Sequence, residues 1–372
     1  MIKSKYIFGL VAFFGALHGC SAAALGVIAW LIGIYKAAEN TPTMHPFVYT
    51  LIYSMPMLCA VAIHLRGAWS WATPAWIFGV IPIAEHASTI FRAKCFDCGG
   101  PKRVSHADGP TRDHWLYDTV LYVSLPIHFF LLALFLSQAA SIENTWDLVG
   151  LIISVGLCSG SLGINVAHEL GHRRGVVDHF LAKCLLSSVL YSHWFVEHNR
   201  GHHLRVATLE DPATSRRGEN VYAFWLRSIT GGVRDAYRMR PKEVLLWQLV
   251  QILLMILIGV ARGPKSVVIF VLTSLVAILL LETVNYIEHY GLLREKNEPV
   301  RPCHSWNSNN VISRMFLFEL THHSDHHANP KKTYARLETK DQAPQLPTGY
   351  AGMVLIALVP PLFFRLMRQN KN

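Results

Sequence analysis

Long uncharged apolar runs constrain the fold of this chain more than any other feature. A helix needs about 20 apolar residues to cross the roughly 30 Å hydrocarbon core of a bilayer. Hydrophobic residues make up 52% of the chain and charged residues only 16%, well below the roughly 25% usual in soluble proteins. We therefore predict an all-α polytopic membrane helix bundle. Its six core spans should lie in the runs Phe47–Leu65, Trp69–Ala84, Thr119–Ser137, Leu148–Ala167, Val244–Ala261 and Ser266–Leu281.

Both ends of the chain carry further apolar segments. Tyr6–Tyr35 is uncharged and too long for a single span, so residues 1–46 are predicted to form an extra N-terminal span. A tight hairpin and a cleaved signal segment are the alternatives. Residues 47–372 are predicted to form one membrane domain. The terminal stretch Gly352–Phe364 is too short to cross and should lie in the interface or re-enter.

The basic residues lie mostly between the apolar runs and therefore indicate which loops face the cytoplasm. The loop between the runs Trp69–Ala84 and Thr119–Ser137 holds five Lys and Arg residues and should face the cytoplasm. Alternation then places the polar segments 168–242 and 282–347 on that side as well. The net charge of +10 follows from this topology, and no nucleic-acid partner is expected.

Histidines cluster in both cytoplasmic segments. Four clusters stand out by their spacing: His168–His172 (HELGH), Glu197–His203 (EHNRGHH), Asn285–Gly291 (NYIEHYG) and Thr321–His327 (THHSDHH). Residues i and i+4 share a helix face, so we expect the two histidines of the first cluster to present their rings to one ion. We expect the same of His198 with His202, and of His323 with His326 and His327. All four clusters should converge below the membrane.

The number of histidines indicates two metal ions. Imidazole suits iron, copper, zinc and nickel, whereas a structural zinc site closes with four ligands, commonly including cysteine. Nine or ten histidines fit two ions with four or five nitrogens each and open positions. Nearby carboxylates are expected to accept the distal ring N–H groups and to fix the tautomers. These candidates are Glu169, Glu197, Asp211, Glu282, Glu288 and Asp325.

Two other classes of protein compete with a two-metal enzyme. His168–His172 also matches the zinc-protease pattern HExxH, but a protease would not need the other three clusters. A membrane metal transporter or metal sensor would place its ligands within the spans, along a pathway. Here the histidines follow the spans instead.

Four motifs together resemble the membrane-bound alkane 1-monooxygenases, within the histidine-cluster group of membrane di-iron hydroxylases and desaturases. They are His198–Ser215 (HNRGHHLRVATLEDPATS), Asn285–Leu293 (NYIEHYGLL), His304–Asn309 (HSWNSN) and Ala343–Met353 (APQLPTGYAGM). The resemblance covers roughly residues 70 to 367. Xylene-type methyl hydroxylases and fatty-acyl desaturases or hydroxylases are the nearest alternatives. Desaturases typically space the second cluster as HxxHH, whereas this chain has HxxxHH.

The resemblance implies a non-haem di-iron enzyme that uses O2 to hydroxylate the terminal methyl group of an n-alkane taken from the bilayer. Electrons would come from NADH through a rubredoxin reductase and rubredoxin, at the cytoplasmic face of a bacterial inner membrane. His322 stands where the family usually has arginine, and the loop with Cys95 and Cys98 departs from the family pattern. The implied iron ligands are His168, His172, His198, His202, His203, His289, His323, His326 and His327.

Arginines in the first cytoplasmic segment offer a docking site for an acidic electron carrier, because opposite charges steer encounter. The candidates are Arg173, Arg174, Arg216 and Arg217. Contact with lipid phosphates and the general bias of cytoplasmic loops explain the same residues equally well.

The apolar runs should also wall the substrate channel, since binding pockets are mostly apolar. We expect a bulky side chain such as Trp76 to limit the length of alkane that fits. Replacing Trp76 with serine should then extend the accepted chain length, measured as the distribution of alkanol products from alkanes of increasing length. An unchanged product distribution would contradict this role.

Overall fold

The computed structural model describes residues 46–87 and 114–369. Every regular element in these ranges is helical, as predicted. Within them, five helices are long and apolar enough to cross a membrane. They are Pro46–Leu65, Trp115–Ala139, Thr145–Gly171, Pro241–Arg262 and Pro264–His289. The extra span predicted in residues 1–46 lies outside the described residues except for Pro46, and so does the loop with Cys95 and Cys98.

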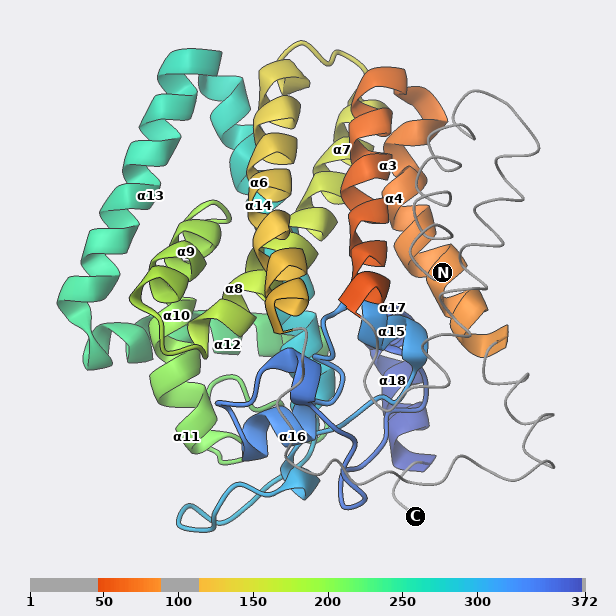
Figure 1. The fold of residues 1–372 in the computed structure, drawn as a ribbon, viewed down its shortest axis with the longest axis vertical. Coiled ribbons are helices and arrows are strands. Elements are labelled where there is room, and N and C mark those ends of the chain that lie inside the picture. The colour runs from red at the N-terminus through yellow and green to blue at the C-terminus, as the bar shows by residue number, and fades with distance from the viewer. Residues whose placement is uncertain (1–45, 88–113, 370–372) are drawn as a thin grey trace.

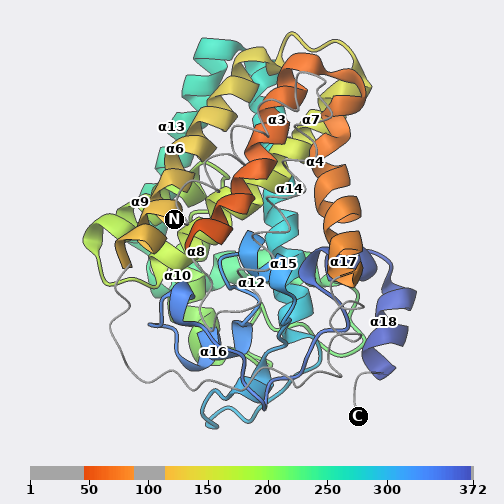
Figure 2. The ribbon, with the colours of Figure 1, turned by 45° about the vertical axis from the view of Figure 1, so that its right-hand side comes forward.

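The remaining predicted span, Trp69–Ala84, is helical but irregular. A 3-10 turn at Gly67–Trp71 leads into α4 (Ala72–Ala75), a π-helical turn follows at Trp76–Val80, and residues 81–87 return to α-helix. Pro74 lies in α4 and supplies no N–H group to the helical hydrogen bonds. This segment packs against α3 (Ser54–Leu65), and the two diverge downward from the top of Figure 2.

The axes of the long helices are roughly aligned with one another, and most of the other helices gather at one end of them (Figure 1). Helices α6 (His114–Ala139), α7 (Thr145–Cys158), α13 (Pro241–Arg262) and α14 (Pro264–His289) form the bundle with α3. The helices that gather at this end are α9 (Val176–Ser187), α10 (Trp194–Glu197), α11 (His203–Arg205), α12 (Val221–Met239), α15 (Val311–Phe316), α16 (His323–Ala328), α17 (Tyr350–Ala357) and α18 (Pro360–Gln369). The predicted terminal segment is thus split between two helices too short to cross.

Two helices carry the chain from the bundle into this histidine-rich end. Beyond α7, a π-helical turn at Ser159–Ile164 leads directly into α8 (Asn165–Gly171), and α14 ends on His289. The combined span Thr145–Gly171 is the interior helix, with 89% of its apolar window buried, whereas α13 is only 17% buried and lies at the periphery. The first and third histidine clusters are therefore held by helices anchored in the bundle.

Glycines allow α7 and α14 to pack closely. Gly156 and Gly160 are four residues apart, the small-xxx-small spacing of tightly packed membrane helices. A Cβ atom on Gly156 would lie 2.5 Å from the Cβ of Val276 and 2.8 Å from the carbonyl oxygen of Thr273. The backbone carbonyl cannot give way, so a larger residue here must push the two helices apart.

Replacing Gly156 with alanine should destabilise the protein by about 1–3 kcal/mol, the usual cost of overpacking. The measurement is thermal unfolding of purified protein in detergent micelles. Gly79→Ala is the matched control, because a Cβ atom there meets nothing within 4 Å. Equal melting temperatures for the two variants would contradict the close packing.

Candidate metal centre

Nine histidines converge at the end of the bundle and form two groups whose ligand atoms all lie within 4.8 Å of one another. They are the nine histidines that the sequence singles out. The five-histidine group contains His168, His172, His198, His203 and His326, and the four-histidine group contains His202, His289, His323 and His327.

The ring nitrogens in each group point at one another. In the five-histidine group, Nε2 of His168 lies 2.9 Å from Nε2 of His326, and Nε2 of His198 lies 3.1 Å from Nε2 of His203. In the four-histidine group, the Nε2 atom of His323 lies 3.0 Å from that of His327. Neighbouring nitrogens on one ion, each about 2.1 Å from it, are separated by about 3 Å. The spacing therefore fits rings that share an ion.

The second cluster does not pair as predicted. His198 belongs to the five-histidine group and His202 to the four-histidine group, so the expectation that they share an ion was wrong. The cause is local: His198–His202 is a π-helical turn, in which hydrogen bonds join residues i and i+5. His203, five residues after His198, shares its group instead. A single turn of helix thus supplies ligands to both groups.

The fourth cluster is also divided between the two groups. His323 and His327, four residues apart on α16, lie in the four-histidine group, whereas His326 lies in the five-histidine group. The prediction that all three share one ion was wrong, because α16 lies between the groups. His322 precedes the helix and stays outside both groups, with its Nδ1 atom 3.3 Å from the carbonyl oxygen of Leu337 and 3.4 Å from Glu319.

Burial keeps most of these rings neutral, which is the form that binds metal. It lowers the pKa of His172 to about 3 and holds the pKa of His198 and His203 well below the usual value. His202 differs: burial disfavours its charged form, but the Asp211 carboxylate, 2.8 Å from Nδ1, raises its pKa. Asp211 thus fixes the ring so that Nε2 faces the group.

The Nε2 atom of His202 is buried and has no hydrogen-bond partner among the described residues. An unpaired buried polar atom is costly, and a bound metal ion would satisfy this one. Together with the spacing and the neutral rings, this observation shows that the two groups can hold metal ions.

The six candidate carboxylates have different neighbours. Asp211 contacts the ring of His202, and Glu288 lies 3.2 Å from Nε2 of His323. The other four have contacts away from the rings. Glu169 accepts from the backbone N–H of Tyr334, Glu197 lies 3.6 Å from Arg205, Glu282 accepts from the hydroxyl of Tyr191, and Asp325 pairs with Lys332 and Lys340.

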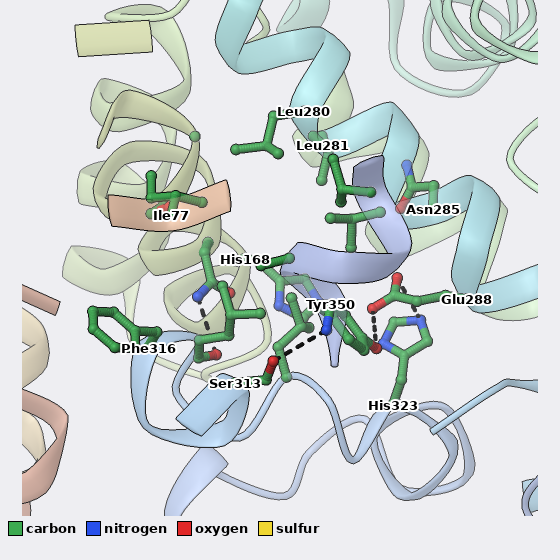
Figure 3. A pocket seen from close by; sticks show the side chains of 18 of the residues that line it. Ile77, His168, Leu280, Leu281, Asn285, Glu288, Ser313, Phe316, His323 and Tyr350 are labelled. Atoms are coloured by element: carbon green, nitrogen blue, oxygen red, sulfur yellow. Dashed lines mark hydrogen bonds and ion pairs between the residues drawn. The ribbon is translucent and has the colours of Figure 1, made fainter. Parts of the chain in front are cut away.

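An apolar cavity opens onto the histidines from the side of the bundle (Figure 3). His168, His198 and His323 form its polar end, and Ile77, Phe78, Ile81, Gly160, Leu280, Leu281 and Val284 are among the residues that line its walls. Trp76, on the same helical segment as Ile77, is half-buried against the apolar core and is not among the lining residues. Its effect on the length of substrate that fits stays a prediction.

Sequence reasoning missed three residues of the cavity. Trp194 stacks on the ring of His198, with centroids 4.2 Å apart, and Asn285 and Tyr350 line the cavity beside Glu288. Asn285 and Tyr350 lie within the NYIEHYG and PTGYAGM motifs, so those motifs were the available signal. Trp194 lies four residues before His198, the spacing of neighbours on a helix face.

The four docking candidates differ in exposure. Arg173 is mostly buried and pairs with Asp118 at 2.8 Å and with Glu169 at 3.7 Å. Arg174, Arg216 and Arg217 are exposed. Of the four candidates, these three present their charge at the surface.

The fold and the site define a membrane helix bundle that can hold two metal ions in a buried histidine site at one end. Comparison with known proteins agrees with this description. The fatty acid desaturase family matches residues 144–356, and the chain belongs to that family.

Relatives with assigned activities are similar over most of the chain. An alkane 1-monooxygenase of Pseudomonas putida is 39% identical over 68% of this chain and 67% of its own length. Alkane 1-monooxygenase 2 of Pseudomonas aeruginosa is 35% identical over 81% of this chain and 83% of its own length. The xylene/toluene monooxygenase hydroxylase component of Pseudomonas putida is 29% identical over 68% and 73%.

Replacing His323 with alanine should remove at least one metal ion per chain, because its Nε2 atom lies among the nitrogens of the four-histidine group. His322→Gln should leave the metal content unchanged, since the His322 ring lies beside Leu337 and Glu319 and outside both histidine groups. Elemental analysis of the purified variants makes the comparison. The reverse pattern would show that the fourth cluster is in a different register.

Proposed function

We propose that this protein is a membrane-bound alkane 1-monooxygenase that hydroxylates the terminal methyl group of n-alkanes to 1-alkanols with O2. The observation that carries the proposal is the apolar cavity that ends at His168, His198 and His323. An n-alkane has no group that can form hydrogen bonds, so only shape and apolar walls can position it. The similarity to alkane 1-monooxygenases supports this substrate class.

The chain's own residues do the positioning. Ile77, Leu280 and Val284 exclude water from the cavity, and the polar end places a terminal carbon beside the histidine nitrogens. We propose that the two groups hold two non-haem iron ions, which when bound supply the activation of O2 that attack on an unactivated C–H bond requires. Imidazole ligands with open positions suit this chemistry.

The electron source and the location belong to the same proposal. We propose that rubredoxin, reduced by an NADH-dependent reductase, delivers electrons at the histidine end, where Arg174, Arg216 and Arg217 are exposed. The histidine end would face the cytoplasm of a bacterial inner membrane, because the loops on that side are rich in basic residues.

Gas chromatography of products tests the proposed function. Cells that express the protein with a rubredoxin and its reductase receive C6 to C16 n-alkanes, and in parallel xylene and a fatty acid. We expect 1-alkanols from the wild-type protein and none from His202→Ala, which lacks a ring of the four-histidine group. Methyl-hydroxylated xylene or unsaturated fatty acid without 1-alkanols would favour the alternative classes.

A further inference from the structure

Glu288 lies where the apolar cavity meets the four-histidine group. It precedes His289 at the end of α14, is 1% exposed, and lines the cavity together with His323 and Tyr350 (Figure 3). A carboxylate in such a dry position requires compensation, because burying an unpaired charge is costly.

The two oxygens of Glu288 have different neighbours. Oε1 accepts a hydrogen bond of 2.8 Å from the hydroxyl of Tyr350, and Oε2 lies 3.2 Å from Nε2 of His323. The backbone N–H of Tyr350 donates to Oγ of Ser313 at 3.1 Å, which ties the start of α17 to α15. Tyr350 therefore holds one oxygen while the other points at the histidine nitrogens.

The surroundings of His323 indicate whether Oε2 of Glu288 accepts a hydrogen bond from the ring or binds the same metal ion. Its Nε2 atom lies 3.0 Å from Nε2 of His327 and 3.2 Å from Nε2 of His289. A ring nitrogen that binds a metal through its lone pair carries no hydrogen and cannot donate to a carboxylate. Oε2 then lies at the same spacing as the neighbouring ring nitrogens, about 3 Å, which is the separation of adjacent ligands on one ion.

The positive charge of two metal ions gives an independent reason to expect a carboxylate ligand. Neutral imidazoles compensate none of the charge of two divalent ions, and the site is buried. Of the six candidate carboxylates, Asp211 reaches the site only through the ring of His202, whereas Glu288 contacts the Nε2 side directly. Buried charges in proteins are paired with one another or coordinate metal ions, so a carboxylate beside a buried cation has a clear role.

We infer that Glu288 supplies a carboxylate oxygen to the metal ion of the four-histidine group, on the side that faces the cavity, and that Tyr350 positions it. This ligand brings the group to five donor atoms, equal to the five-histidine group. The inference deepens the proposed function and rests on it only for the identity of the ion.

Titration of metal-free full-length protein in detergent with Co²⁺ tests the assignment through metal affinity and the visible absorption of the bound ion. The wild-type chain should bind two ions. Glu288→Gln keeps the size but removes the charge, and should weaken one of the two sites by at least about 10-fold while leaving the other unchanged. The absorption of the weakened site should also change, because its oxygen ligand is altered.

Tyr350→Phe should give a smaller loss at the same site, because the carboxylate remains but is no longer held. Tyr49→Phe is the matched control. Its hydroxyl donates to Oε1 of Glu319 at 2.7 Å, another buried tyrosine–glutamate pair, and neither residue belongs to the two histidine groups. This variant should bind Co²⁺ as the wild-type protein does.

Unchanged affinity and absorption in folded Glu288→Gln would overturn the inference and leave Glu288 only as the hydrogen-bond acceptor of the Tyr350 hydroxyl. Loss of both ions would also contradict it, because the five-histidine group does not depend on Glu288. The proposed function fails separately, if the wild-type protein binds two ions but forms no 1-alkanol.

Discussion

The mutual approach of nine imidazole rings at the dry end of a helix bundle is the constraint on which the rest of the structure depends. Rings with nitrogens 2.9–3.2 Å apart cannot all be protonated, and burial keeps most of them neutral. Such an arrangement is stable when each group of lone pairs faces a cation. The spans, the π-helical turns and the short helices all serve to bring these rings together.

The sequence predicted the class of fold and the identity of the clustered histidines. Apolar runs located the five long helices, because bilayer thickness sets their length directly. Spacing alone could not assign histidines to groups. It treated His198–His202 as α-helix, whereas the π-helical turn there brings His198 together with His203. A periodicity of 3.6 residues does not mark the position of a π-helical turn, in which residues i and i+5 are joined.

The carboxylates also show that spacing in the sequence does not predict which side chains meet in the fold. All six were candidates to orient rings, and four of them adjoin a histidine in the chain. In the structure, Glu169, Glu197, Glu282 and Asp325 contact other partners. Only the folded chain brings Tyr350 to Glu288 and separates the roles of its two oxygens. The role of Trp76 in limiting alkane length stays a prediction, and its neighbours Ile77, Phe78 and Ile81 are the residues of that segment that line the cavity.

The central claim is that one chain holds two metal ions through imidazole nitrogen. X-ray absorption at the iron edge of the purified protein, combined with iron analysis, tests it most directly. The account predicts about two irons per chain and a first shell of nitrogen and oxygen at roughly 2.1 Å, the usual distance of imidazole nitrogen from a first-row metal ion. One iron per chain in fully folded protein, or sulfur in the first shell, would contradict it.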